Sequence, residues 1–146
     1  MALAHGVRIT RSRSVRPGDW PVAVIPTSDR LTATIAAVSA EHARAGSGTI
    51  AVIATESVIA DLYPDLVEAF GREVGRGAAG LTRPIAILTP QESKGLEFDS
   101  VVVVEPQRII DEVARGAGAL YVAMTRATQR LQLVSTEPLP SGIESH

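Results

Sequence analysis

The sequence contains no cysteine, which excludes disulfide bonds, thiolate metal sites and cysteine nucleophiles. Aromatic residues make up only 3% of the chain, so its core must be built from Ala, Val, Ile and Leu. The three histidines, His5, His42 and His146, are too scattered to suggest a metal site. No apolar run approaches the length of a membrane span, and the first residues lack the apolar region of a signal peptide. We therefore expect a cytoplasmic protein with no membrane partner.

Lysine is almost absent as well: Lys94 is the only one, and the other basic residues are arginines. The net charge of −2 is unevenly spread, because most of the acidic groups follow residue 50. Four arginines lie in the segment RITRSRSVR at residues 8–16. Such a cluster can contact phosphate. The alternative, which we expect for residues 1–20, is a solvated and partly disordered basic segment.

Five short apolar runs predict β-strands, because each is rich in β-branched residues and bounded by polar or turn residues. Helical patterns separate most of them, and this alternation predicts βαβ units with right-handed crossovers. We therefore expect an α/β fold over residues 21–136, with a mostly parallel five-stranded sheet, helices on both faces and a frayed tail at 137–146. The expected strands are residues 21–26, 49–54, 84–89, 100–105 and 131–136.

The first expected helix has Ser28 as its N-cap and Gly46 as its stop. Its apolar stripe runs through Leu31, Ile35 and Val38, and His42 extends the stripe as a packed or half-exposed side chain. A second helix should begin at residue 55 and break at residue 64, where a proline stands. The segment GREVGRGAAG, at residues 71–80, is expected to be a glycine-rich loop.

The segment TPQESKGLEFDSVVVVE, at residues 89–105, places a polar loop directly before four valines. The valines predict a strand that is buried on both faces. Lys94 and Gly95 would then lie at the entrance of this strand, where a carboxylate such as Glu97 can accept a hydrogen bond from a ribose hydroxyl. The plainer interpretation is a turn that leads into the strand, with Phe98 packed and Glu97 solvated.

The third expected helix enters after residue 116 or 118 and carries an apolar stripe at helical spacing. The stripe residues are Leu120, Ala123, Met124 and Ala127. On such a helix Arg126 would lie about 110° from the centre of the stripe, at a flank. An arginine there is either a solvated charge or a side chain that meets phosphate across an interface.

The blocks TPQESKGLEFDSVVVV and ALYVAMTRATQRLQLV, in this order and at this spacing, resemble motifs V and VI of superfamily 1 UvrD/Rep-type helicases. The resemblance covers residues 84–135 and is closest to the HelD-like branch. It implies a RecA-like fold, namely the second lobe of a P-loop NTPase without the P-loop itself. The implied function is that of the C-terminal motor lobe of an ATP-dependent DNA helicase or translocase.

The resemblance also implies roles for particular residues. Arg126 matches the motif VI arginine that reaches the γ-phosphate of ATP bound on the other lobe, and is the implied catalytic residue. Glu97 matches the acid that contacts the nucleotide sugar, and Gly95 lets the backbone approach the nucleotide. Tyr121 matches the motif VI tyrosine, which we expect to be a packing residue.

A nucleic-acid track is implied at the beginning of the same loop. Thr89 matches a threonine beside the nucleic acid, and Lys94 matches the motif V lysine, to which we assign a positioning role there. DNA-unwinding members commonly have a histidine two residues after the threonine, where this chain has Gln91. Glutamine can still bind phosphate or base, and the difference favours the HelD-like interpretation. Single-stranded DNA is the implied partner, and RNA polymerase the alternative.

The chain lacks a G-x-x-x-x-G-K-[ST] phosphate loop and the acidic pair that would hold Mg²⁺. We therefore expect a lobe that works with an N-terminal RecA-like lobe, on which ATP and Mg²⁺ are held, and that does not hydrolyse ATP alone. Two alternatives remain. One is a HelD-like ATPase that remodels RNA polymerase without unwinding DNA, and the other is a non-catalytic α/β binding module.

Overall fold

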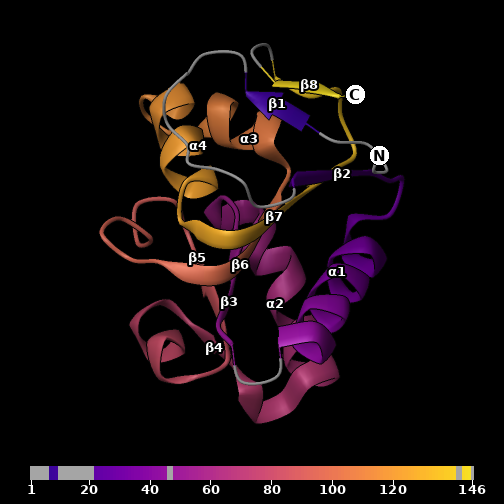
Figure 1. Cartoon of the computed structure of the whole chain (residues 1–146), viewed down its shortest axis with the longest axis vertical. Helices are drawn as coiled ribbons and strands as arrows, with labels where there is room; N and C mark the ends of the chain where they lie inside the picture. Colours follow the sequence, from indigo (N-terminus) through magenta and orange to yellow (C-terminus); the bar gives the residue numbers. More distant parts are fainter. Residues whose placement is uncertain (1–6, 10–21, 46–47, 141–142, 146) are drawn as a thin grey trace.

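The computed structural model describes residues 7–9, 22–45, 48–140 and 143–145. Its centre is a six-stranded sheet in which all neighbouring strands are parallel (Figure 1). The order across the sheet is β2-β7-β6-β3-β5-β4. The strands are β2 (Val22–Pro26), β3 (Ile50–Ile53), β4 (Val74–Arg76), β5 (Ile85–Leu88), β6 (Phe98–Val104) and β7 (Ala127–Ser135).

The parallel sheet confirms the prediction from the sequence, but the predicted count of five strands is wrong. The additional strand is β4, which lies inside the segment predicted as a glycine-rich loop and is followed by a 3₁₀ segment, η2 (Gly77–Thr82). A Cβ on Gly75 would lie 2.7 Å from the Cα of Gly80, and a Cβ on Gly80 would lie 2.4 Å from the carbonyl oxygen of Gly75. The glycines therefore allow two backbones to touch, and three residues are too few to show an apolar alternation.

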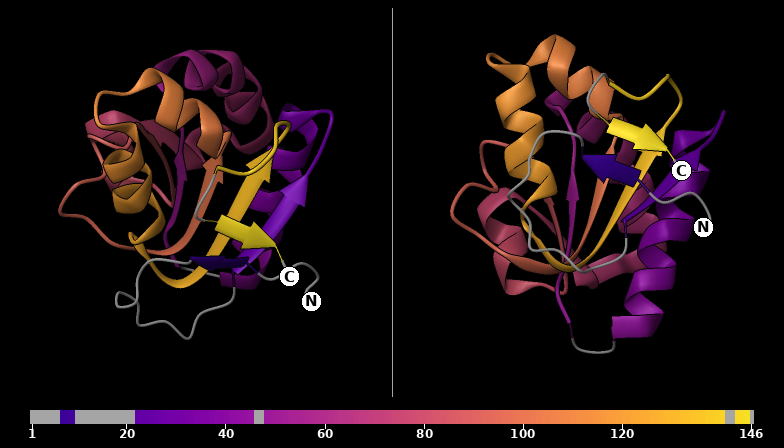
Figure 2. Two further views of the ribbon diagram at one scale, coloured as in Figure 1. Left: turned by 90° about the horizontal axis from the view of Figure 1, so that it is seen from above. Right: turned by 45° about the horizontal axis from the view of Figure 1, so that its top comes forward.

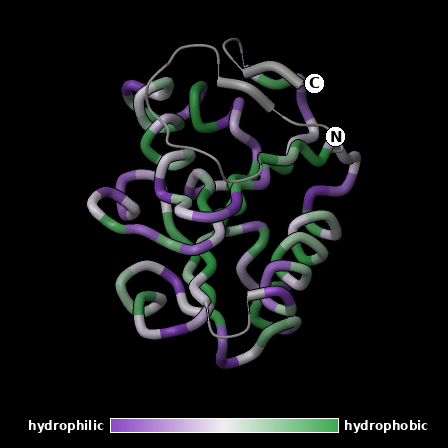
Figure 3. Tube along the Cα trace, viewed as in Figure 1, coloured by the Kyte–Doolittle hydropathy of each residue, from purple (hydrophilic) through white to green (hydrophobic). Residues whose placement is uncertain are grey.

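Helices cover both faces of the sheet, as predicted (Figure 2). Helices α1 (Arg30–Ala45) and α2 (Glu56–Phe70) pack on one face, and α3 (Pro106–Glu112) and α4 (Gly116–Met124) pack on the other. The valines of β6 alternate between these faces: Val101 and Val103 belong to the cluster with α3 and α4, Val102 and Val104 to the other. All four are fully buried, which confirms a strand buried on both faces, and Figure 3 shows the apolar strands at the centre.

Helix α1 begins one residue later than predicted, because Asp29 rather than Ser28 caps it. The Oδ1 atom of Asp29 accepts a hydrogen bond from the backbone N–H of Thr32 at 3.2 Å, and Oδ2 accepts one from the Thr32 hydroxyl at 2.8 Å. These bonds lower the pKa of Asp29, the side-chain bond contributing most. Gly46, the predicted stop, lies outside the described residues.

The buried face of α1 is also shifted from the predicted stripe. Leu31 and Ile35 are only half-buried. Instead, Glu41 is buried, and its carboxylate accepts a hydrogen bond from the Ser100 hydroxyl of β6 at 2.8 Å. His42 is half-exposed, within the prediction, and its Nε2 lies 2.5 Å from Glu73 of a second 3₁₀ segment, η1 (Gly71–Glu73). The fully buried residues of this face are Thr34, Ala37, Val38 and Glu41.

Helix α2 continues through Pro64, so the predicted break into two helices is wrong. A proline inside a helix leaves the carbonyl four residues earlier, here that of Ala60, without its partner. Both Pro64 and Ala60 are exposed, so water can satisfy this carbonyl. The buried residues of α2 keep their spacing on both sides of the proline, and they hold the helix together.

Helix α4 ends at Met124, earlier than predicted, and residues 127–135 form β7. Ala127 is buried, as its place in the stripe predicts, but it lies on a strand that pairs with Phe98 of β6. The beginning of β7 fits both a helical stripe and a strand, and its pairing with β6 selects the strand. Arg126 therefore lies in the turn between α4 and β7 rather than on a helix flank.

A separate two-stranded antiparallel sheet joins β1 (Val7–Ile9) to β8 (Ile143–Ser145). These strands come from residues 1–20 and 137–146, the two segments that were predicted to lie outside the α/β fold. Their pairing was not predicted. Three of the arginines in the basic cluster, Arg11, Arg13 and Arg16, lie outside the described residues.

Candidate nucleotide and nucleic-acid site

The loop between β5 and β6 begins at the carboxyl edge of the sheet with a reciprocal cap. The backbone N–H of Thr89 donates to the Glu92 carboxylate at 2.9 Å, and the N–H of Glu92 donates to the Thr89 hydroxyl oxygen at 3.2 Å. This is the pattern that Thr-x-x-Glu predicts in a sequence. Because the Thr89 hydroxyl accepts in this contact, its hydrogen stays available for an outside acceptor.

The middle of the loop is anchored by Ser93 and presents polar side chains around it. Ser93 is fully buried, and its hydroxyl donates to the carbonyl of Pro90 at 2.7 Å. Gln91 and Lys94 are exposed on this turn. One buried serine thus fixes a turn on which two groups that can bind phosphate face solvent.

The end of the loop leads into β6 through Gly95, which has a φ of +79°. This left-handed conformation favours glycine, and the position of a Cβ there is open space. Glu97 is exposed and Phe98 is packed, which agrees with the plainer interpretation of this turn and leaves the Glu97 carboxylate free to accept hydrogen bonds.

Arg126 closes onto the end of the same loop. Its Nη1 donates to the carbonyl of Leu96 at 3.3 Å, and its own carbonyl accepts the N–H of Phe98 at 2.9 Å. Its Nε donates to the carbonyl of Val122, at the end of α4, at 2.9 Å, and its Nη2 donates to the hydroxyl of Thr125 at 3.2 Å. A cation is favourable at the carboxyl end of a helix. Arg126 thus joins the segment of residues 119–134 to the segment of residues 89–104 in space.

The half-buried guanidinium of Arg126 keeps a full positive charge for an outside anion. Within the described residues it forms no ion pair, because all three of its partners are uncharged oxygens. Arginine has five N–H donors, of which these contacts use three. Two donors can therefore bind a phosphate group, because none of the hydrogen bonds of Arg126 in the described residues goes to a carboxylate.

The structure divides the predicted site residues between two edges of the sheet. Gly95, Glu97 and Arg126 lie at the amino ends of β6 and β7. Thr89 follows the last residue of β5, which is level with Leu133 of β7, far along that strand from Arg126. The loop that begins at Thr89 therefore crosses the sheet from its carboxyl edge to its amino edge, with Gln91 and Lys94 between.

Tyr121 lies on α4 one turn before Arg126. Its side chain is 40% exposed, so the expected packing role is wrong. Its backbone carbonyl accepts the hydroxyl of Thr125 at 3.0 Å and so belongs to the end of α4 that supports Arg126.

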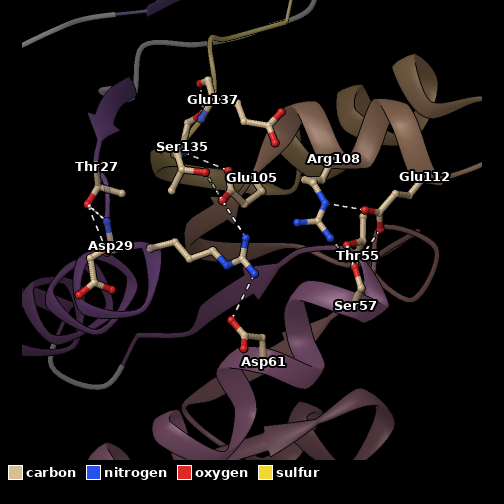
Figure 4. Close-up of polar contacts among 12 residues, drawn as sticks. Thr27, Asp29, Thr55, Ser57, Asp61, Glu105, Arg108, Glu112, Ser135 and Glu137 are labelled. Atoms are coloured by element: carbon tan, nitrogen blue, oxygen red, sulfur yellow. Dashed lines mark hydrogen bonds and ion pairs between the residues drawn. The ribbon is translucent and has the colours of Figure 1, made fainter.

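The carboxyl edge is held by a second polar cluster, centred on Glu105 (Figure 4). Glu105 follows β6 and is 1% exposed. Its carboxylate accepts the N–H and the hydroxyl of Thr136 at 3.0 and 2.6 Å, and it accepts Nη1 of Arg30 at 3.0 Å. Arg30 also donates to Asp61 of α2 at 3.2 Å. These bonds fix the ends of β6 and β7 against α1 and α2.

No group of three or more histidine, aspartate or glutamate side chains is arranged to hold a metal ion in the described part of the chain. Likewise, none of its helices is both long and apolar enough to cross a membrane.

Sequence reasoning did not find the groups that hold Arg126. The Leu96 acceptor is a backbone carbonyl, which every residue has, so no residue type indicates it. Thr125 is adjacent to the arginine in the sequence, but its role depends on the end of α4, which was predicted too late. The role of Glu92 could have been found, since Thr-x-x-Glu is a capping pattern.

Solved structures show the fold of this chain to be that of helicase lobes. The C-terminal domain of a possible DNA helicase from Lactobacillus plantarum WCFS1 superposes with a TM-score of 0.64 at 22% identity, over 86% of this chain and 79% of that one. The Sulfolobus solfataricus SWI2/SNF2 ATPase core in complex with dsDNA gives a TM-score of 0.59 at 14% identity, over 94% of this chain but 29% of that one. The Pyrococcus furiosus Hef helicase domain gives a TM-score of 0.52 at 14% identity, over 82% of this chain and 30% of that one.

The family comparison concerns a part of the chain. Residues 84–134 match the model of the UvrD-like helicase C-terminal domain. This range contains every predicted site residue, from Thr89 to Arg126. A comparison with curated proteins found no match.

Proposed function

We propose that this chain is the C-terminal motor lobe of an ATP-dependent superfamily 1 DNA helicase or translocase. The observation that carries the proposal is the contact of Arg126 with the loop that contains Gly95 and Glu97. It brings a cation with two free donors beside an exposed carboxylate and an open backbone turn. Phosphate and sugar are the parts of ATP that such groups bind.

In this proposal ATP and Mg²⁺ are held by an N-terminal RecA-like lobe, and the present lobe completes the site when the two close. Arg126 then stabilises the charge that develops on the γ-phosphate as it is transferred, which is where an arginine finger acts. Glu97 accepts a hydrogen bond from the ribose. The uncharged partners of Arg126 support this role, because they orient the guanidinium without neutralising it.

Thr89, Gln91 and Lys94 form the proposed contact with single-stranded DNA. Thr89 lies across the sheet from Arg126, and Gln91 and Lys94 lie on the loop between them, which supports a DNA contact joined to the nucleotide region by one loop. A change at either end of this loop can then be transmitted to the other, as coupling of ATP hydrolysis to movement along DNA requires.

A second candidate is a HelD-like ATPase that remodels RNA polymerase without unwinding DNA. Gln91 favours this candidate, because DNA-unwinding members of the helicase family that the chain resembles commonly have histidine at that position. Glutamine cannot carry the positive charge that histidine can, so an electrostatic contribution to phosphate binding is missing.

The test is ATP turnover by a protein that joins this lobe to its ATP-binding lobe, measured with and without single-stranded DNA. We expect no turnover from the isolated lobe, turnover from the joined protein, and stimulation by DNA. Stimulation by RNA polymerase but not by DNA would favour the second candidate. Turnover by the isolated lobe would contradict both, and a joined protein that binds ATP without hydrolysing it under any of these conditions would indicate a non-catalytic binding module.

A further inference from the structure

The guanidinium of Arg126 rests on a hydroxyl group whose own hydrogen is already committed. The Oγ1 atom of Thr125 donates toward the carbonyls of Tyr121 and Val122, at 3.0 and 3.1 Å. A hydroxyl has one hydrogen and two lone pairs. Thr125 therefore acts toward Nη2 of Arg126 as an acceptor, at 3.2 Å.

Three acceptors on three different nitrogens fix the plane of this guanidinium. The carbonyl of Val122 holds Nε, the carbonyl of Leu96 holds Nη1, and the hydroxyl of Thr125 holds Nη2. Two of these acceptors are backbone groups that no substitution removes. Thr125 supplies the one side-chain contact among them, so it is where the orientation depends on the residue type.

We propose that Thr125 is a positioning residue for the arginine finger. Its oxygen fixes the guanidinium plane while two N–H groups stay free for the phosphate of ATP on the other lobe. The proposal rests on the proposed function, since it deepens the role given there to Arg126. The orientation itself is a property of this chain, and it can be measured without any turnover.

The first measurement is the rate at which the Arg126 guanidinium rotates about its Nε–Cζ bond, observed by NMR on its Nη groups in the isotope-labelled chain. Thr125→Val keeps the branched shape but removes the acceptor, and Thr125→Ser keeps the hydroxyl. Thr128→Val is the matched control, because Thr128 donates to the carbonyl of Phe98 at 3.2 Å in the same region without contacting Arg126. We expect rotation several-fold faster in Thr125→Val and unchanged in the other two variants.

The second measurement is turnover by the protein that joins this lobe to its ATP-binding lobe. We expect Thr125→Val to lower kcat about tenfold, the size of one hydrogen bond to a charged group, with KM for ATP little changed. Thr125→Ser and Thr128→Val should turn over normally. Thermal unfolding of all three variants shows whether the fold is kept, and Thr125→Ala, which also lacks the acceptor, takes the place of the valine variant if that variant does not fold.

Unchanged guanidinium rotation in Thr125→Val would overturn the proposal whatever the turnover. So would normal turnover of that variant in a protein that Arg126→Ala inactivates. Normal turnover of Arg126→Ala would overturn the proposed function and the catalytic part of this proposal together, while the rotation rates would still show whether Thr125 orients the side chain.

Discussion

At the scale of single residues, two buried carboxylates tie helices to strands. Burial alone would raise the pKa of Glu41, but hydrogen bonds from Arg130, Ser100 and Gln132 outweigh it and lower the pKa. In the same way, bonds from Thr136 and Arg30 outweigh burial and lower the pKa of Glu105. As the pH falls, both groups therefore stay charged in the folded protein after they have become protonated in the unfolded chain.

Stability should fall in acid because of these two groups. Their folded-state pKa values lie below the ordinary value of 4.5. The unfolded state therefore binds more protons as the pH falls past that value. The contribution of these two carboxylates to the free energy of unfolding should be fully present above about pH 5. It should be lost progressively as the pH falls through the lowered pKa values.

Glu105→Gln isolates one of these contributions. The neutral amide cannot pair with Arg30, so we expect a loss of about 2–4 kcal/mol of unfolding free energy at pH 7 and a weaker dependence on pH below 5. Urea unfolding at a series of pH values measures both, with Glu68→Gln, on the exposed side of α2, as the control. An unchanged pH dependence in Glu105→Gln would show that this carboxylate is not the group that titrates.

The sequence identified charged residues of the candidate site but not the atoms that orient them. Arg126, Glu97 and Gly95 could be proposed because their types and order resemble known motifs. The carbonyls of Leu96 and Val122 could not, because a backbone acceptor has no residue type. Glu105 was also missed, since a carboxylate directly after a valine strand gives no sign of the guanidinium that it meets.

At the scale of elements, the junction of α3 and α4 depends on one glycine. A Cβ on Gly116 would lie 2.3 Å from the carbonyl oxygen of Ile110 and 2.5 Å from its Cα. Gly118, two residues further along the same helix, has nothing within 4 Å of that position. The same substitution at the two sites should therefore have opposite effects.

Gly116→Ala should destabilise the fold by about 1–3 kcal/mol, because α4 must move away from α3. Gly118→Ala should be neutral or stabilise by up to about 1 kcal/mol, since alanine favours a helix and loses less entropy on folding. Thermal or urea unfolding of the two variants, side by side, gives the comparison. Equal effects at both positions would contradict the close packing of these helices.

Strands were predictable where the apolar pattern and the length of a segment both indicated a strand. The buried strands β3, β5 and β6 are continuous apolar runs, and each was found. Residues 125–130 were assigned to a helix because a helical stripe continues through Ala127, and only the pairing of residues 127–130 with β6 reveals a strand there. Strand β4 was missed since it has only three residues, Val74–Arg76, and its pairing with β5 leaves no apolar alternation in the sequence.

At the scale of the whole molecule, a parallel sheet places Thr89 at its carboxyl edge and the proposed nucleotide residues at its amino edge, with Gln91 and Lys94 between them. The loop of residues 89–97 connects them, and Arg126 fastens its far end. The architecture was predictable because strands and helices alternate, which leaves few topologies.

The most direct test of the central claim is the kcat of Arg126→Ala at saturating ATP in the joined protein, with ATP affinity measured on the same preparation. Arg72→Ala is the control, because Arg72 is exposed and distant in sequence from the site. An arginine finger contributes about 10³–10⁵ in rate. We predict a loss of that order for Arg126→Ala, with ATP affinity nearly unchanged and normal turnover for Arg72→Ala. Turnover by Arg126→Ala equal to that of Arg72→Ala would contradict the account.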